Sequence, residues 1–153
     1  MGSDKSNPGT RLARYGRAGP SQGQNLAFGM ANSGIDVIMQ LIIDDGASTR
    51  PSRQVIFNSN YKLTGIATCA HKSRTMMASI LYTDTYTINA EGQKRLTKVM
   101  SQNPTPLIQK ITAGKEMAPI VRGEISALDK SIYYWQNKLR TDPSTLLPHL
   151  EAL

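Results

Sequence analysis

A mixed fold of helices and a small antiparallel sheet, the α+β class, is predicted by three patterns in this 153-residue sequence. Apolar residues recur with helical spacing over residues 33–44 and again over residues 125–140. Between them, "YKLTGIATCA" and "TMMASILYT" are typical of two strands, which the polar "HKSR" joins as a hairpin. A chain of this length is expected to form a single domain with one core.

The first helical pattern begins after Asn32 or Ser33, either of which is a suitable N-cap. Its apolar positions are Ile35, Ile38, Met39, Leu41 and Ile42. The pattern ends at Asp44-Asp45-Gly46. We interpret Asp44 and Asp45 as residues that stop the helix and form a loop, rather than as a catalytic pair of carboxylates.

Three stretches carry weaker patterns. Residues 1–23 are rich in Gly, Ser and Pro and are expected to form a loop. Residues 47–60 are also expected to be a loop, with a short apolar centre. Residues 87–124 are interpreted as a linker or an extended arm, because Pro104 and Pro106 exclude the interior of a helix there.

The last helical pattern carries one apolar stripe. The stripe consists of Ile125, Leu128, Ile132, Trp135 and Leu139, with Tyr133 and Tyr134 beside it. Such a stripe indicates a buried face, but not which chain buries it. We predict that it binds a partner, and the alternative is that it covers the chain's own sheet. Asp142-Pro143 should end this helix and start a short further turn.

The composition indicates the cellular compartment in which we expect the protein. No apolar run approaches the roughly 20 residues of a membrane span, and the amino terminus lacks the apolar core of a secretory signal. The single cysteine, Cys69, cannot form an internal disulfide and is expected to be a small buried core residue. We therefore expect a reducing, cytoplasmic setting.

The net charge of +7 suggests an acidic partner. Residues 1–90 carry +4 and residues 91–153 carry +3, so the charge is spread along the sequence. No Lys/Arg run exceeds two residues, and basic and aromatic residues do not alternate as on an RNA-stacking surface. An acidic protein surface is therefore favoured over nucleic acid, and no membrane contact is expected.

Seven short segments occur in an order and at spacings that resemble the later two-thirds of the CAP superfamily, the cysteine-rich secretory and pathogenesis-related proteins. They are "GSD", "RLARYG", "GQNLAFG", "IMQLIIDDG", "RPSRQVIFN", "YKLTGIA" and "ASILYTD", within residues 2–86. The resemblance implies an α-β-α sandwich, in which a small antiparallel sheet between helical layers encloses a cavity.

The family's cavity carries two His and acidic residues that can hold a metal ion, and this chain departs from that pattern. Gln24 and Asn25 follow Gly23 where the family has Gly-Glu-Asn, and Ser52 stands where the family has a His. An amide and a hydroxyl are poor substitutes for a carboxylate base or a transition-metal ligand. His71 and His149 lie in other sequence contexts. We expect degenerate cavity positions with no catalytic residue, no metal and no cofactor.

The family's opening helices are missing before "GSD", but "WQNKLRTDPSTLLPHLEAL" at residues 135–153 resembles the first of them. Asn137, Lys138, Leu139, Arg140 and Pro143 carry this likeness. Three explanations remain open: a circular permutation, the junction of two tandem domains, or a split protein whose missing helix comes from another chain. The CAP-like sandwich is thus expected to be incomplete within this chain.

These observations predict a non-enzymatic structural subunit of a larger protein assembly, in a cytoskeletal or ciliary setting. Two alternatives remain. A lipid or sterol carrier would line a pocket with the apolar residues Met76, Met77, Ile80 and Leu81. A metal-dependent hydrolase would need at least three protein ligands for its ion.

Overall fold

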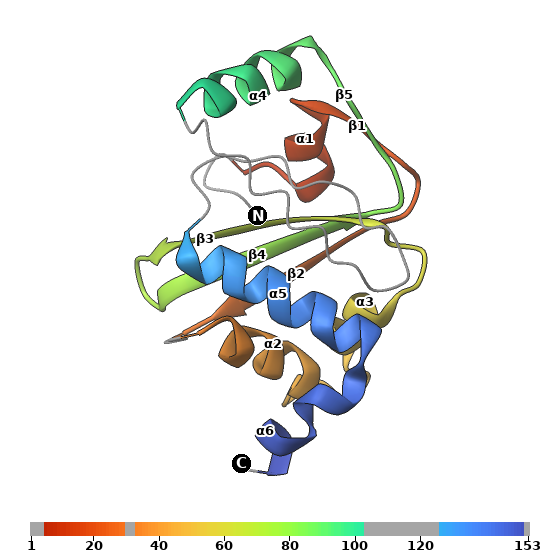
Figure 1. Ribbon diagram of the computed structural model, residues 1–153, viewed down its shortest axis with the longest axis vertical. Helices are drawn as coiled ribbons and strands as arrows, with labels where there is room; N and C mark the ends of the chain where they lie inside the picture. The colour runs from red at the N-terminus through yellow and green to blue at the C-terminus, as the bar shows by residue number, and fades with distance from the viewer. Residues whose placement is uncertain (1–4, 30–32, 103–125, 152–153) are drawn as a thin grey trace. The chain divides into compact units, whose positions relative to one another are not determined.

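The computed structural model describes residues 5–29, 33–102 and 126–151, which form helices and small antiparallel sheets (Figure 1). The chain divides into two compact units. Unit 1 comprises Met1–Gly23, Ser59–Thr64 and Leu81–Glu124, and unit 2 comprises Gln24–Asn58, Gly65–Ile80 and Ile125–Leu153. The units interleave along the chain.

Three strands contribute residues to both units. They are β2 (Gln22–Phe28), β3 (Leu63–His71) and β4 (Thr75–Thr83), and their order in the sheet is β2-β4-β3. The predicted strand pair and its connection are confirmed by β3 and β4. Residues 23–28 of the segment "GQNLAFG" lie in strand β2, and its last residue, Gly29, directly follows the strand with a positive φ of 114°.

Unit 1 contains a short two-stranded ribbon with one helix before it and one after it. Its elements are α1 (Pro8–Ala13), β1 (Gly16–Ala18), β5 (Tyr86–Ile88) and α4 (Ala90–Gln102). Strands β1 and β5 pair antiparallel, with Arg17 opposite Thr87.

The prediction of a loop over residues 1–23 is wrong where helix α1 and strand β1 lie. The six-residue helix α1 is too short to show a helical period in the sequence. Its signal is local, because Asn7 accepts a hydrogen bond from the Thr10 backbone N–H (2.8 Å) and Pro8 occupies the first turn.

The prediction of a linker or extended arm over residues 87–124 is wrong for the part of that range that forms helix α4. Asn89 supports the first turn by accepting a hydrogen bond from the Gly92 backbone N–H (2.8 Å). The helix is difficult to recognise because most of its described side chains are polar and exposed, with Leu96 half-buried. Residues 103–124, including Pro104 and Pro106, lie outside the described residues.

Tyrosines make the main side-chain contacts of unit 1. Tyr61 and Tyr82 stack with their ring centroids 5.5 Å apart, and the Tyr61 hydroxyl donates to the Gln22 carbonyl oxygen (3.1 Å). The Tyr86 hydroxyl donates to the Leu12 carbonyl oxygen (2.8 Å). Burial, and secondarily the nearby Tyr15, raises the pKa of Tyr86 above its ordinary 10.0.

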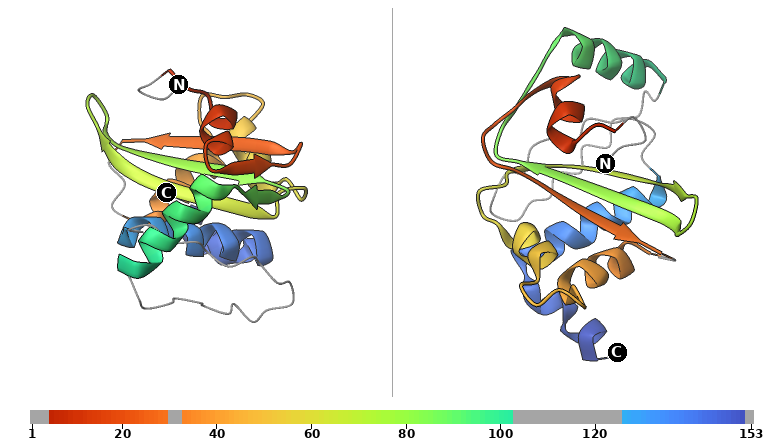
Figure 2. Two further views of the ribbon diagram at one scale, coloured as in Figure 1. Left: turned by 90° about the horizontal axis from the view of Figure 1, so that it is seen from above. Right: turned by 180° about the vertical axis from the view of Figure 1, so that it is seen from behind.

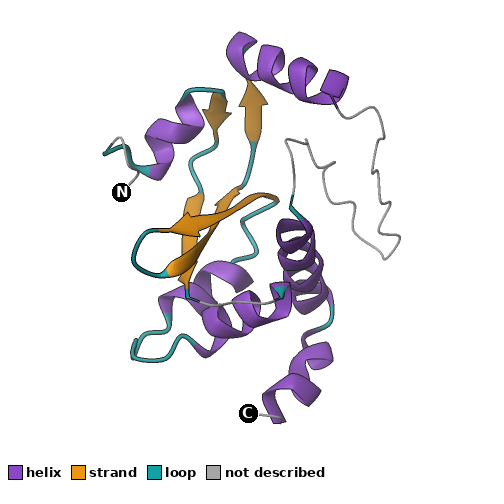
Figure 3. Ribbon diagram, turned by 90° about the vertical axis from the view of Figure 1, so that its left-hand side faces the viewer, coloured by secondary structure: helices purple, strands orange, loops and turns teal. Residues whose placement is uncertain are grey.

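Unit 2 is dominated by helices. They are α2 (Gly34–Ile43), α3 (Pro51–Phe57), α5 (Ala127–Thr141) and α6 (Leu147–Glu151), with a 3₁₀ turn at Pro143–Leu146 before α6. Helices α2, α3 and α5 lie on one face of the strand segments of this unit (Figures 2 and 3). The two helical patterns in the sequence, and the break at Asp142-Pro143, are confirmed.

Both long helices of unit 2 begin with a capping box. Ser33 exchanges hydrogen bonds with Asp36 at the start of α2, and Ser126 does so with Asp129 at the start of α5. The two helices approach closely at Gly34, where an added Cβ would overlap the backbone of α5. Their facing residues form the centre of the apolar core of unit 2. That core comprises Ala27, Val37, Ile38, Met39, Leu41, Ile42, Ile56, Ala78, Ile80, Ile132, Leu139 and Leu146.

The loop expected over residues 47–60 is corrected by α3. This helix turns only Ile56 fully inward, so it has too few buried positions to show a period. Its start is set by the backbone, because Arg50 adopts a left-handed conformation (φ 46°) and Pro51 follows at the first helical position.

Strand β3 leaves one of its faces uncovered. Gly65, Ala67 and Cys69 are exposed and alternate with the half-buried Ile66 and Thr68. An added Cβ at Gly65 would meet no atom within 4 Å. The expectation that Cys69 is buried is therefore wrong. Alternation along the strand places it on the face opposite to the helices of unit 2.

Candidate functional site

The three predicted cavity positions lie around strand β2. Asn25 is 3% exposed, and its Nδ2 donates to the Ser52 carbonyl oxygen (3.0 Å). The Ser52 backbone N–H in turn donates to Asp44 Oδ2 (2.7 Å). This series of hydrogen bonds joins the strand to the start of α3 and to the end of α2.

Gln24 is separated from this series. It neighbours Asn25 on a strand, so the two side chains point to opposite faces of the sheet. Its Nε2 donates to Ser79 Oγ on strand β4 (2.9 Å). The structure thus brings Asn25 and Ser52 together and leaves Gln24 on the other face.

The carboxylates near these positions already have structural partners. Asp44 is the left-handed C-cap of α2 (φ 49°), and its carboxylate accepts the Ser52 N–H. Asp45 Oδ1 accepts the Gly46 backbone N–H (2.9 Å). The interpretation of Asp44 and Asp45 as a helix stop is confirmed. Their hydrogen bonds hold the neighbouring backbone segments in place.

The histidines and the cysteine lie apart. His71 Nδ1 accepts a hydrogen bond from the Ser73 N–H (3.4 Å), and its ring meets Phe28 edge-on at 5.4 Å. His149 meets the Trp135 ring edge-on, also at 5.4 Å. Within residues 5–29, 33–102 and 126–151, His, Cys, Asp and Glu side chains form no group of three that could hold a metal ion.

The predicted partner-binding stripe is corrected in part. Ile132 is 0% and Leu139 2% exposed, because α5 packs on α2 with these residues inside, so they cannot contact a partner. Leu128, Tyr133 and Trp135 are half-buried. Ile125 lies outside the described residues.

An exposed apolar patch on α5 and α6 includes Tyr134 and Trp135, which were named from the sequence, and the α6 residues Leu147 and Leu150, which were not. We call it the α5–α6 patch, and it consists of Tyr134, Trp135, Leu147, His149 and Leu150. Tyr134 is 49%, Leu147 53% and Leu150 40% exposed. Trp135 contacts both the Tyr134 ring (5.3 Å) and the His149 ring. The run Tyr133-Tyr134-Trp135 is the available signal, since three consecutive large residues cannot all face one side of a helix.

The residues of the predicted lipid carrier lie on strand β4. Ile80 is fully buried, whereas Met76, Met77 and Leu81 are half-buried.

Among the helices that the structure describes, none is both long and apolar enough to cross a bilayer.

Comparisons with protein-family models, with curated proteins and with solved structures give no match for this chain.

Proposed function

We propose that this protein is a non-enzymatic structural subunit: a degenerate CAP-like domain that another chain completes within a larger assembly. The observation that carries the proposal is the α5–α6 patch on unit 2. The CAP assignment itself depends on the seven sequence segments named above. A cytoskeletal or ciliary assembly in the cytoplasm remains the setting that we propose for it.

The α5–α6 patch supports the proposal because three large apolar side chains are about half exposed within one short region. They are Tyr134, Leu147 and Leu150. Isolated exposed apolar residues are ordinary, but a group beside a half-buried Trp is typical of a protein contact. Fully burying one such side chain contributes about 1.5–3 kcal/mol, so covering their exposed parts favours association.

The uncovered face of β3 supports completion by another chain. Gly65, Ala67 and Cys69 are small, so a helix could approach the strand backbone closely there. In a CAP sandwich both faces of the sheet are covered by helices. The exposed residues of β3 are therefore where we place the missing layer.

The geometry of the cavity positions supports a role without catalysis. Gln24, Asn25 and Asp44 each make a hydrogen bond within the fold, and these bonds join strands and helices. A general base or nucleophile needs a reactive group directed at a substrate. Here the polar groups hold secondary structure together instead.

The α5–α6 patch is tested by the variant Tyr134→Ser/Leu147→Ser/Leu150→Ser. The tagged full chain is expressed in the cells from which it comes, and the lysate is separated on a sucrose gradient that retains cytoskeletal complexes. The wild-type chain should migrate with a large complex, and the variant should migrate as free protein. Lys72→Ser/Lys130→Ser/Lys138→Ser serves as the control and should behave like the wild type.

Far-ultraviolet circular dichroism shows whether each variant is folded, because the near-ultraviolet signal of Trp135 would change with the loss of the Tyr134 ring beside it. If the wild-type chain migrates as a free monomer, the proposed role in an assembly is wrong. If the folded patch variant stays with the large complex, this patch is not the contact surface.

Completion of the sheet is tested through Cys69, the only cysteine. In the isolated chain a maleimide reagent should label this exposed thiol rapidly. In the native assembly labelling should be at least about tenfold slower, because the completing chain would cover β3. Equal labelling rates in the two states would contradict coverage of this face.

A further inference from the structure

Charge is divided unequally between the two units. Among the described residues, unit 1 carries eight Lys and Arg against two Asp and Glu, and unit 2 carries seven against six. The net charges are therefore +6 and +1. The expectation of evenly spread charge, which came from comparing residues 1–90 with residues 91–153, does not hold for the folded chain.

Helix α4 presents part of this charge on one side. Lys94, Arg95 and Lys98 are exposed, and their spacings of one, three and four residues place them on adjoining positions of the helix surface. Arg95 lies over the Tyr15 ring, 5.3 Å from its centroid. The start of α4 is held against the same loop, because the Asn89 backbone N–H donates to the Tyr15 carbonyl oxygen (3.0 Å).

Arg17 adds a cation on the ribbon from which α4 continues. It is exposed on β1 and pairs across the ribbon with Thr87 on β5. Arg17 lines an open hollow of about 610 Å³, which the polar residues Gln22, Thr85 and Thr87 also line. The Arg17 guanidinium and the two threonine hydroxyls supply hydrogen-bond donors that suit a carboxylate, whereas Gln22 Nε2 already donates to the Gly19 carbonyl oxygen (2.9 Å).

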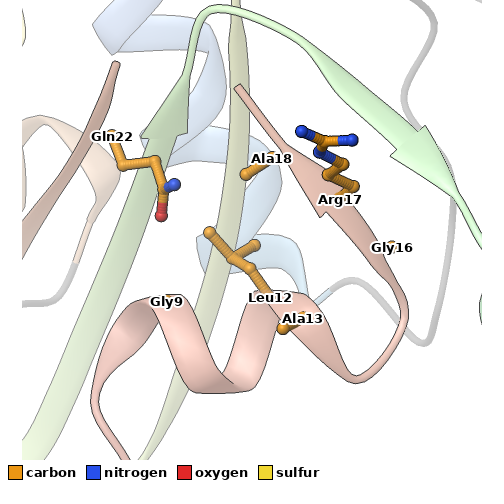
Figure 4. A pocket seen from close by; sticks show the side chains of 7 residues that line it. All are labelled: Gly9, Leu12, Ala13, Gly16, Arg17, Ala18 and Gln22. Carbon is orange, nitrogen blue, oxygen red and sulfur yellow. The ribbon is translucent and has the colours of Figure 1, made fainter. Parts of the chain in front are cut away.

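A second hollow, of about 280 Å³, adjoins the first and shares Arg17, Ala18 and Gln22 with it. In Figure 4 the Leu12 side chain points from α1 toward Ala18 and Gln22, whereas the Arg17 guanidinium points away from Leu12. The apolar side chain therefore occupies one side of β1, and the cation is directed toward the other.

Three of these cations are exposed and have no ion-pair partner among the described residues. They are Arg17, Lys94 and Lys98. Glu91 and Asp84 are the only acidic residues among the described residues of unit 1. Asp84 is already used locally, because its Oδ1 accepts the Thr85 backbone N–H (2.8 Å).

The positions of the tyrosines in unit 1 indicate which class of anionic partner this unit can bind. Arg95 covers Tyr15, Tyr61 and Tyr82 are buried against each other, and the hydroxyl of the half-buried Tyr86 is bonded within the fold. The described residues of unit 1 thus offer no open aromatic face on which a base could stack. Ile88, 36% exposed, is their one exposed large apolar side chain, which is too little to insert into a bilayer.

We propose that unit 1 binds an acidic polypeptide segment through Arg17 on β1 and through Lys94, Arg95 and Lys98 on α4. Arginine forms paired hydrogen bonds with carboxylates, and the lysines add long-range attraction. The proposal goes beyond the structural role proposed above. It concerns another unit and other residues, so either can fail without the other.

The test measures binding of a fluorescein-labelled oligoglutamate peptide to the full chain by fluorescence anisotropy. Arg17→Gln/Lys94→Gln/Lys98→Gln should weaken binding about tenfold, as the loss of three exposed ion pairs of ordinary strength would. Lys72→Gln/Lys130→Gln/Lys138→Gln removes the same charge from unit 2 and should leave the affinity within about twofold of the wild type. All six residues are in contact with solvent, and far-ultraviolet circular dichroism checks that the variants are folded.

An oligothymidylate of equal charge is the competing probe, measured at the same salt concentration. The proposal is supported if the peptide binds more tightly than the oligothymidylate and only the unit 1 variant weakens it. Equal weakening by both triple variants would show attraction to net charge alone and would overturn the proposal. Tighter binding of the oligothymidylate, or no binding of the peptide, would overturn it as well.

Discussion

Twelve of the fourteen buried apolar side chains among the described residues belong to unit 2, and the two that belong to unit 1 are Tyr61 and Tyr82. Unit 2 is therefore stabilised mainly by aliphatic packing between α2, α3, α5 and the sheet. Unit 1 depends more on strand pairing and on tyrosine hydroxyls bonded to backbone carbonyls. The same chain thus contains one unit with an apolar core and almost no net charge, and another with little apolar core and a charge of +6.

This difference shows how the two units can serve different contacts. Like charges repel one another in a compact state, so a strongly basic unit gains from an acidic partner. Unit 2 has a larger aliphatic core and can keep its fold while exposing the α5–α6 patch. The following predictions test whether the two units differ in stability as their cores do.

The largest effect is expected for Ile132→Ala. Ile132 is 0% exposed within the α2–α5 contact, so its truncation should leave a cavity and cost about 2–5 kcal/mol. Urea unfolding followed by the fluorescence of Trp135, which lies on the same helix, measures this loss. Tyr134→Ala, two residues along on the exposed side of the same helix, should change the free energy of unfolding by less than about 0.5 kcal/mol. Equal losses in the two variants would mean that α5 does not bury its stripe against α2.

A smaller effect is expected for Gly34→Ala. The added methyl group would overlap the backbone of α5 at Ser131 and Ile132, so the helices must separate, at a cost of about 1–3 kcal/mol. The matched control is Gly65→Ala, where the new Cβ meets no atom within 4 Å. The control should be neutral or slightly stabilising by the same urea measurement. A neutral result for Gly34→Ala would contradict the close approach of the two helices.

The smallest effect is expected for Tyr86→Phe in unit 1. Losing the hydrogen bond to Leu12 should cost about 0.5–1.5 kcal/mol at neutral pH, measured by urea unfolding with far-ultraviolet circular dichroism. The raised pKa of Tyr86 adds a pH dependence. Above about pH 10 the unfolded chain releases this proton first, so the folded state binds more protons and its stability falls as pH rises.

The Phe variant should lack this part of the alkaline loss, so its deficit relative to the wild type should shrink as the pH rises above about 10. The difference between the two proteins isolates Tyr86 from the other tyrosines. A deficit that stays constant or grows over that range would contradict the assigned shift.

Elements with a long apolar period could be predicted from the sequence. Helices α2 and α5 show it, and each begins with a Ser that the structure places in a capping box. Strands β3 and β4 follow from β-branched and apolar runs joined by a polar turn. The short helices α1 and α3 and the largely polar α4 were missed, because their local caps, Asn7, Arg50 and Asn89, do not produce a period.

The candidate site was less predictable than the fold. Asn25 and Ser52 were singled out together and do lie together, whereas Gln24 points to the opposite face of the sheet. Two residues of the predicted stripe, Ile132 and Leu139, belong to the chain's own core. The exposed patch beside them depends on α6, whose position relative to α5 cannot be read from a helical period.

The sequence by itself determined the mixed helix and strand composition, the two capped amphipathic helices and the hairpin, because spacing and capping act between residues close in the chain. Only the tertiary structure decided which side of α5 is buried, that Cys69 is exposed, and that unit 1 carries most of the net positive charge of the described residues. Those outcomes depend on which distant segments pack together. All the apolar faces must be buried at the same time, and this decides which residues become neighbours in space. The order of the residues along the chain does not show which ones these are.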